Sequence, residues 1–293
     1  MDWLRSYIGQ VSIFHEVAAA PNISFVAAKS GPGSSVSSIA SVDSRDGKLN
    51  WRRVLPEKEY VTGLFSAPMI IDGSAYRNKR GDSPALLVSV SVRAPPTRKA
   101  MLYTHIVRAW DSSSGEIAWE RSFTVSRQSQ LLGVVCQAQP SVSDVVAVAC
   151  GDHAYLLRSS NGDDIWKWSP PSGSVEGGLR LAITLNGEDG DHGSSTSHPN
   201  LFVVGLLPGR STAIVAAVSL ESALDATANI KQRTISLLSE PASVNHMGIV
   251  SAARAVVFVD ENGGIAAYSL AGLGKKLLEV SVTSSLFDPR MDL

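Results

Sequence analysis

The sequence has almost no net charge and no long apolar segment. Its 293 residues include 26 Lys and Arg against 27 Asp and Glu, a net charge of −1, so no electrostatic argument supports binding to nucleic acid or to an anionic membrane surface. The apolar run at 201–207 predicts a buried strand, because a membrane-spanning helix needs about 20 apolar residues. Residues 1–5 lack the basic and apolar regions of a signal peptide. Taken literally, these features predict a soluble cytosolic chain, and a mature or truncated form of a longer precursor fits them equally well.

Side chains that support catalysis or metal binding are not grouped. His192 and His198 have five residues between them and no cysteine nearby, which is not a zinc-binding arrangement. The acidic stretch at 188–191 lacks the alternating ligands and closing glutamate of a calcium loop. The segment at 205–210 lacks the Gly-Lys-Ser/Thr of a phosphate loop, and no serine lies in a nucleophile-elbow pattern. We therefore expect no catalytic, cofactor-binding or metal-binding residues.

Only two cysteines are present, Cys136 and Cys150, on either side of a polar segment at 139–144. Each ends an apolar segment that predicts a strand. If the two strands pair around the polar turn, the thiols face one another and can form a disulfide. The alternative is two buried free thiols that behave as small apolar side chains, and the sequence leaves both open.

The sequence does contain one motif in three copies, at 41–51, 109–119 and 156–166. In each copy a glycine follows a short polar run, and a tryptophan follows the glycine by four positions. Such recurrence indicates a repeat architecture, and most repeat folds present surfaces to partners rather than catalytic centres. The glycine and tryptophan pairs are Gly47 and Trp51, Gly115 and Trp119, and Gly162 and Trp166.

Each copy predicts a β-hairpin. A three-residue hairpin turn needs one residue with positive φ, which glycine adopts without steric strain. Asp43 and Asp111 stand at the turn entrance, where a carboxylate accepts backbone N–H groups, whereas Arg158 occupies this place in the third copy. Leu49 and Ile117 lie two positions before their tryptophans, so we expect each pair to share one apolar face. All three tryptophans are expected in the core, where an indole buries about 150–250 Å².

The spacing of the copies favours an all-β propeller of four-stranded antiparallel blades. The tryptophans are 68 residues apart (119 − 51) and then 47 apart (166 − 119), and one blade takes about 40–50 residues. A polar insertion at 76–99 explains the longer interval, although 86–92 within it predicts a strand, and a second loop insertion is expected at 186–200. Two apolar segments joined by an Asn-Gly turn at 255–265 continue the pattern. We expect residues 1–293 to form about five to six blades, as all or part of a ring.

Shorter motifs flank the three hairpins. They are Asp2-Trp3, Tyr7-Ile8-Gly9 and Val11 at the start, Gly47, Trp51-Arg52 and Val54 in the first hairpin, Arg108-Ala109-Trp110 before the second, and Lys167 after the third tryptophan. These motifs, in this order, resemble the N-terminal region of the ER membrane protein complex subunit 1 family, whose repeat is that of quinoprotein-like propellers. The resemblance is specific over residues 2–168 and thin afterwards.

The resemblance implies a non-catalytic luminal scaffold of the ER membrane protein complex, which supports the insertion and biogenesis of tail-anchored and multipass membrane proteins. It implies other subunits of the complex and membrane-protein clients as partners, no nucleic acid and no cofactor. Family members are longer, with a cleaved signal peptide and a transmembrane helix, so membrane association would come only through parts absent from this chain. Asn22 lies in the one Asn-x-Ser/Thr sequon and is expected to be glycosylated if the chain reaches the ER lumen.

Two other functions share the repeat. A free-standing propeller that acts as an interaction hub would have the same hairpins. A quinoprotein dehydrogenase would also need a calcium-held cofactor, a carboxylate base and the adjacent cysteine pair of those enzymes, and the two cysteines here are isolated. The scaffold is therefore the favoured interpretation.

Overall fold

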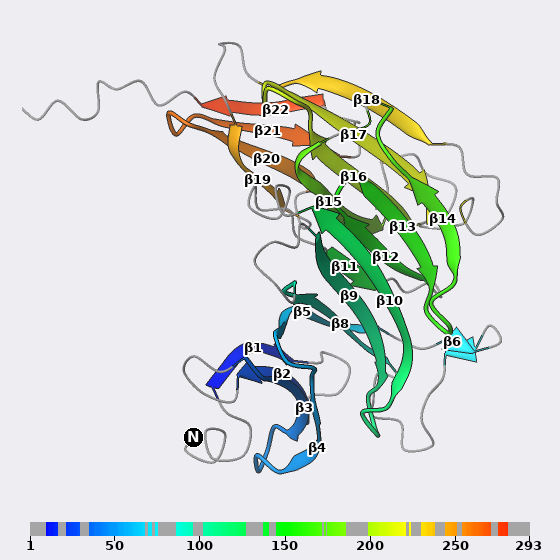
Figure 1. Ribbon diagram of the computed structural model, residues 1–293. Coiled ribbons are helices and arrows are strands. Elements are labelled where there is room, and N and C mark those ends of the chain that lie inside the picture. Colours follow the sequence, from blue (N-terminus) through cyan, green and yellow to red (C-terminus); the bar gives the residue numbers. More distant parts are fainter. Residues whose placement is uncertain are drawn as a thin grey trace, which may run out of the picture. The chain divides into compact units, whose positions relative to one another are not determined.

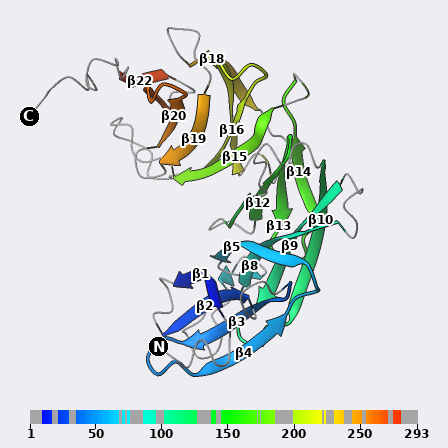
Figure 2. The same ribbon diagram turned by 60° about the vertical axis from the view of Figure 1, so that its left-hand side comes forward.

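The computed structural model describes the chain chiefly as antiparallel β-sheet, with the strands of each sheet running side by side (Figure 1 and Figure 2). The residues that the structure describes are 10–16, 22–29, 35–67, 70–71, 74–75, 86–95, 102–126, 137–140, 145–171, 173, 175–185, 199–220, 223, 230–237, 244–250, 254–270 and 275–280.

The chain divides into two compact units, and the first, Met1–Trp168, contains three four-stranded sheets in its described residues. Each strand pairs with the next strand of its sheet along the chain, and a small hairpin, β6 (Ile70–Ile71) and β7 (Ser74–Ala75), lies in the sequence between β5 and β8. The first sheet is β1 (Gln10–Glu16), β2 (Ile23–Lys29), β3 (Ser37–Asp43) and β4 (Leu49–Val54); the second is β5 (Glu59–Ala67), β8 (Leu86–Arg93), β9 (Leu102–Asp111) and β10 (Ile117–Ser126); the third is β11 (Gln137–Pro140), β12 (Val145–Cys150), β13 (His153–Arg158) and β14 (Asp164–Trp168).

The second unit, Ser169–Leu293, contains two sheets of the same kind in its described residues. The fourth sheet is β15 (Glu176–Leu185), β16 (Pro199–Leu206), β17 (Thr212–Ser219) and β18 (Lys231–Ser236), and the fifth is β19 (Val244–Val250), β20 (Ala255–Asp260), β21 (Ile265–Ser269) and β22 (Lys275–Val280).

Position within the sheet decides the composition of each strand. The central strand β12 (VVAVAC) is buried at every residue, as expected of a strand covered on both faces. The edge strand β4 (LNWRRV) is buried only at Trp51. The motif tryptophan is thus the one side chain by which this edge strand enters the core.

The apolar core of the first unit lies between neighbouring sheets. One cluster joins the first and second sheets and includes Phe25, Trp51 and Leu87. Another joins the second and third sheets and includes Trp119 and Leu157. Each of these clusters contains one motif tryptophan, which links the hairpin motif to the packing of sheet on sheet.

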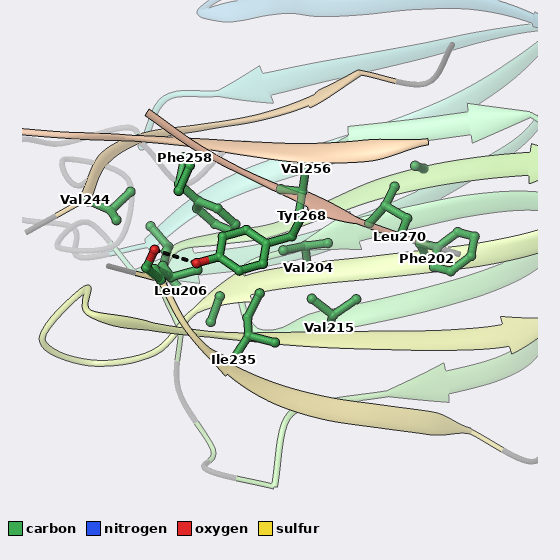
Figure 3. Packing of buried hydrophobic residues seen from close by; sticks show 14 residues of the cluster. Phe202, Val204, Leu206, Val215, Ile235, Val244, Val256, Phe258, Tyr268 and Leu270 are labelled. Atoms are coloured by element: carbon green, nitrogen blue, oxygen red, sulfur yellow. Dashed lines mark hydrogen bonds between the residues drawn. The ribbon is translucent and has the colours of Figure 1, made fainter. Parts of the chain in front are cut away.

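A cluster of buried apolar residues in the second unit is built from both of its sheets (Figure 3). The rings of Phe258 and Tyr268 meet edge to face, with centroids 5.8 Å apart, an arrangement that aromatic pairs prefer. The Tyr268 hydroxyl donates to the carbonyl oxygen of Leu237 at 2.5 Å, the dashed line in Figure 3. The buried hydroxyl is therefore satisfied, and it ties the fifth sheet to the chain that follows β18.

The predicted all-β class with four-stranded antiparallel sheets is confirmed. The strand expected at 86–92 is β8, and the hairpin expected at 255–265 is formed by β20 and β21. Residues 76–85, 96–99 and 186–198 of the expected insertions lie outside the described residues. Among the described residues, no helix has the length and apolar character needed to cross a bilayer.

Candidate functional site

The three motif hairpins share one backbone geometry. Gly47, Gly115 and Gly162 have φ values of 74°, 69° and 74°. In each hairpin the glycine N–H donates to the carbonyl oxygen four residues earlier, and the N–H of that earlier residue donates to the carbonyl oxygen just after the glycine, all at 2.8 Å. These bonds are unchanged where Arg158 replaces the aspartate. The glycine, rather than the side chain at the entrance, therefore determines the turn.

The entrance aspartates add side-chain bonds to two of the turns. Asp43 accepts the backbone N–H of Arg45 at 2.9 Å and forms an ion pair with its guanidinium at 2.8 Å. Hydrogen bonds from the Arg45 side chain and backbone lower the pKa of Asp43 to about 2. Asp111 accepts the N–H groups of Ser113 and Ser114, each at 2.8 Å. Burial alone would raise the pKa of Asp111, but hydrogen bonds from these serines outweigh it and the pKa lies below its usual value.

A β-bulge separates each tryptophan from the residue two positions before it. In the first hairpin, the β3 residues opposite Leu49 and Trp51 are neighbours in the chain, so β4 carries one extra residue. Leu49 and Ile117 are 38% and 51% exposed, whereas Trp51 and Trp119 are 8% and 6% exposed. The expectation of a shared apolar face was wrong, because the extra residue reverses the alternation of side chains along the strand.

The indole of the first hairpin lies on the glycine of the second. A Cβ atom added at Gly115 would lie 2.6 Å from Cδ2 and Cε3 of Trp51, closer than real Cβ contacts. The Trp51 Nε1–H donates to the carbonyl oxygen of Ser112, in the same turn, at 2.8 Å. Glycine is therefore needed at this position for two reasons: its positive φ and the absence of a Cβ beneath the indole.

The same contact recurs between the second and third sheets. A Cβ atom at Gly162 would lie 2.9 Å from Cδ2 of Trp119, and the Trp119 Nε1–H donates to the carbonyl oxygen of Ser159 at 2.6 Å. We call these two contacts, of Trp51 with the 112–115 turn and of Trp119 with the 159–162 turn, the tryptophan locks. They connect the three sheets of the first unit in succession.

An arginine two positions after each of these tryptophans strengthens the locks. Arg53 donates to the carbonyl oxygens of Gly115 at 2.8 Å and Ser114 at 3.0 Å. Arg121 forms an ion pair with Asp164 of the third hairpin at 2.6 Å. Sequence reasoning missed both arginines, although their common spacing from the tryptophan was a signal that could have found them.

The third motif does not repeat this arrangement. Trp166 is only partly buried, contrary to expectation, while Trp168 is 7% exposed.

The second sheet also holds an ionic cluster that spans its four strands. Glu59 of β5 is fully buried, and its carboxylate forms an ion pair with Arg108 of β9. It also accepts hydrogen bonds from Ser91 Oγ and Arg93 Nη2 of β8, both at 2.7 Å. Arg108, itself 3% exposed, donates from Nε to Glu120 of β10 at 2.5 Å. Two carboxylates and two guanidinium groups thus form a neutral set.

The cluster favours the charged forms of Glu59 and Arg108. Burial raises the pKa of Glu59, but hydrogen bonds from Arg108, Ser91 and Arg93 outweigh it, so that the pKa lies below its usual value. Burial lowers the pKa of Arg108, but its bonds to Glu59 and Glu120 raise it above the usual value. A buried charge is tolerated only when it is paired and hydrogen-bonded in this way.

These contacts join the strands of the second sheet. Among the described residues, no group of three or more His, Cys, Asp or Glu side chains could hold a metal ion. The Glu59 carboxylate is paired with Arg93 of β8 and Arg108 of β9. The cluster can hold β5, β8, β9 and β10 in register, since each bond crosses from one strand to another.

The remaining residues singled out from the sequence lie apart from the locks. Asn22 is exposed in the turn before β2, whereas Ser24 of the same sequon is 3% exposed and its Oγ lies 2.7 Å from Ser44 Oγ. Cys150 is 6% exposed and disulfide-bonded, so it is not a free thiol. Cys136 lies outside the described residues.

The double requirement for glycine at 115 can be measured. Gly151 is the matched control, because it also has positive φ, 62°, but has no atom within 4 Å of an added Cβ. We expect Gly151→Ala to lower the free energy of unfolding by about 1–2 kcal/mol through backbone strain alone. Gly115→Ala should cost about 1–3 kcal/mol more, because Trp51 must move. Urea denaturation monitored by circular dichroism measures both, and equal losses would show that the indole contact contributes nothing.

The burial of the Glu59–Arg108 ion pair predicts that replacing Arg108 destabilises the chain more than replacing Arg93. Arg108→Met leaves the buried carboxylate without its main partner, and we expect it to lower the free energy of unfolding by about 3–5 kcal/mol. Arg93→Met is the control, because the Arg93 side chain is 40% exposed and Arg108 remains to neutralise Glu59. Its effect should be clearly smaller. A comparable loss in both variants would show that Arg108 contributes no more to the stability of the cluster than Arg93 does.

Solved structures of propellers are similar to this chain at low sequence identity. The structure of the Dos1 propeller matches with a TM-score of 0.55 at 11% identity, covering 94% of this chain and 63% of that one, and shows the propeller fold. BamB from Moraxella catarrhalis matches with a TM-score of 0.45 at 12% identity, covering 88% of this chain and 58% of that one. The Myceliophteria thermophila Cps50 (Swd1) beta-propeller domain matches with a TM-score of 0.48 at 11% identity, covering 92% and 72%. This chain therefore spans 58–72% of the length of these three structures.

A search of curated proteins found no match. The model of one protein family, the EMC1 N-terminal beta-propeller domain, matches residues 1–289, nearly the whole chain. The two tryptophan locks and the four-stranded sheets fit the propeller that this description specifies. The chain belongs to the EMC1 N-terminal beta-propeller domain family.

Proposed function

We propose that this chain is a non-catalytic scaffold on the luminal side of the ER membrane protein complex, where it supports the insertion of tail-anchored and multipass membrane proteins. The observation that carries the proposal is the family match over residues 1–289. Its partners are the other subunits of the complex and membrane-protein clients.

The structural role of the motif residues supports a scaffold function. Trp51, Gly115, Trp119 and Gly162 are all engaged in joining one sheet to the next. Sheets joined in this way form a rigid unit. A rigid surface loses little conformational entropy when it binds a partner. We extend this role to all of 1–293 as one propeller of about five to six blades.

The disulfide of Cys150 supports the luminal side. Disulfides persist in oxidising compartments such as the ER lumen and are rare in the cytosol. We propose Cys136 as the partner, because it is the one other cysteine of the chain. Consistent with this pairing, the adjacent residues Gln137 and Ala149 lie opposite one another in β11 and β12.

Affinity purification tests the role in the complex. A tagged full-length product is isolated from ER membranes in mild detergent, and the proteins that co-purify are identified by mass spectrometry. We expect the other subunits of the ER membrane protein complex in near-stoichiometric amounts. An unrelated luminal protein with the same tag is the control, and recovery of no subunit above that control would contradict the proposal.

Glycosylation at Asn22 tests the luminal location separately. Asn22 is exposed, so the folded sheet can accommodate a glycan, but Ser24 is buried, so the sugar must be transferred before the first sheet folds. Glycosidase treatment should increase the gel mobility of the product, and Asn22→Gln should abolish that shift. Asn262→Gln is the matched control, since Asn262 is exposed and lies outside any sequon. If glycosidase does not change the mobility of the chain with its original sequence, glycosylation no longer supports the luminal location.

A further inference from the structure

An irregular segment at the start of β15 positions an arginine, Arg180, in the fourth sheet (β15 in Figure 1). Glu176 lies opposite Leu206 and Arg180 opposite Val204. Four steps along β15 thus match two along β16, so β15 carries extra residues here. Bulges of this kind redirect side chains, and they are designed features of a strand rather than defects.

Glycines on both strands make the irregularity possible. Gly177 and Gly178 have φ values of 74° and 75°, a backbone conformation that other residues adopt only with strain. Leu179 is then fully buried, and a Cβ atom added at Gly205 would lie 2.8 Å from its Cδ2 atom. The next residue, Arg180, is only partly buried. The segment thus buries an apolar side chain and directly follows it with a partly buried cation.

Arg180 has little to bind within the described residues. The hydrogen bond of its side chain there goes from Nη1 to the carbonyl oxygen of Gly177, at 3.2 Å. The nearest acidic residue in the strand, Glu176, is already engaged by Arg210 Nε at 2.6 Å and by the N–H of Gly209 at 3.2 Å. Burial lowers the pKa of Arg180, and no carboxylate among the described residues opposes this shift.

This situation differs from that of the other arginines in ion pairs. Arg93 and Arg108 bind Glu59, Arg121 binds Asp164, and Arg210 binds Glu176. For Arg108, the carboxylate contacts outweigh burial and raise the pKa above its usual value. Arg180 is also partly buried, but no carboxylate of the described residues pairs with it.

We propose that Arg180 is an anchor for a carboxylate side chain of a partner protein. The planar guanidinium matches a carboxylate in two parallel hydrogen bonds. Part of the desolvation cost is already present in the unbound chain, so binding an anion gains more here than at a solvated arginine. One guanidinium neutralises one carboxylate, which favours an acidic side chain over a phosphate. The inference rests on the proposed scaffold role in that it requires a protein partner.

The first measurement uses the chain alone. Arg180→Met removes a charge with one weak internal bond, and we expect the melting temperature to stay the same or rise. Arg210→Met, which breaks the ion pair with Glu176 in the same sheet, should lower it. A fall for Arg180→Met as large as for Arg210→Met would show that Arg180 serves the fold, and would overturn the proposal.

The second measurement uses the complex isolated from membranes. Arg180→Glu should reduce the recovery of one co-purifying subunit about tenfold or more, as the loss of a desolvated charge contact at an interface does. Arg233→Glu makes the same charge change at an exposed residue of β18 and should leave recovery unchanged.

Cross-linking then identifies the acidic residue of the co-purifying subunit that lies against Arg180. Replacing that acidic residue by lysine should restore binding to the Arg180→Glu variant. Equal recovery with both variants overturns the inference while leaving the scaffold role intact; recovery of no subunit by the unmodified chain contradicts both.

Chemical modification tests whether the carboxylate that binds Arg180 belongs to a partner protein or to this chain. Phenylglyoxal, which reacts with arginine, should label Arg180 in the isolated chain and leave it protected in the complex, as peptide mass spectrometry can show. The acidic residues of the β15–β16 connection, Glu188, Asp189 and Asp191, lie outside the described residues. If Arg180 is protected in the isolated chain and changing these three to amides exposes it, the occupant is internal and the proposal is wrong.

Discussion

The contact between an indole and a bare glycine backbone is the constraint on which the first unit depends. Trp51 reaches Gly115 of the next sheet, and Trp119 reaches Gly162 of the one after. In each case the indole N–H donates to a carbonyl oxygen of the same turn, so the buried indole donor has an acceptor. Since the glycine that allows the tight turn also provides room for the neighbouring indole, one residue determines both the hairpin and the packing of sheet on sheet.

The buried charged side chains of the second sheet are likewise fully paired. In the second sheet, Glu59 and Arg108 are buried but compensated by Ser91, Arg93 and Glu120, and every bond joins two strands. In the fourth sheet Arg180 has only a carbonyl oxygen as hydrogen-bond partner within the described residues. A low-dielectric interior makes this difference costly, which is why an incompletely paired arginine points to a binding contact and a fully paired one to the fold.

Sequence patterns predicted the fold class and the hairpins, because both depend on local rules: strand alternation, turn glycines and the interval between copies. They were wrong about Leu49 and Ile117, since a single bulge residue reverses the alternation and has no signature in three short copies. Arg53 and Arg121 were missed although their spacing from tryptophan is the same, because an arginine on an edge strand is usually a solvated residue.

The sequence by itself determined where the chain turns, which strands are apolar and which family the repeat belongs to. These properties arise within segments of about a dozen residues and follow from backbone sterics and side-chain alternation. Only the tertiary structure decided which groups meet: the indole of Trp51 and the carbonyl oxygen of Ser112 are 61 residues apart in the chain, and Glu59 and Arg108 are 49 apart. Such contacts are formed when the strands and sheets pack, so their partners follow from register and bulges that no local pattern specifies.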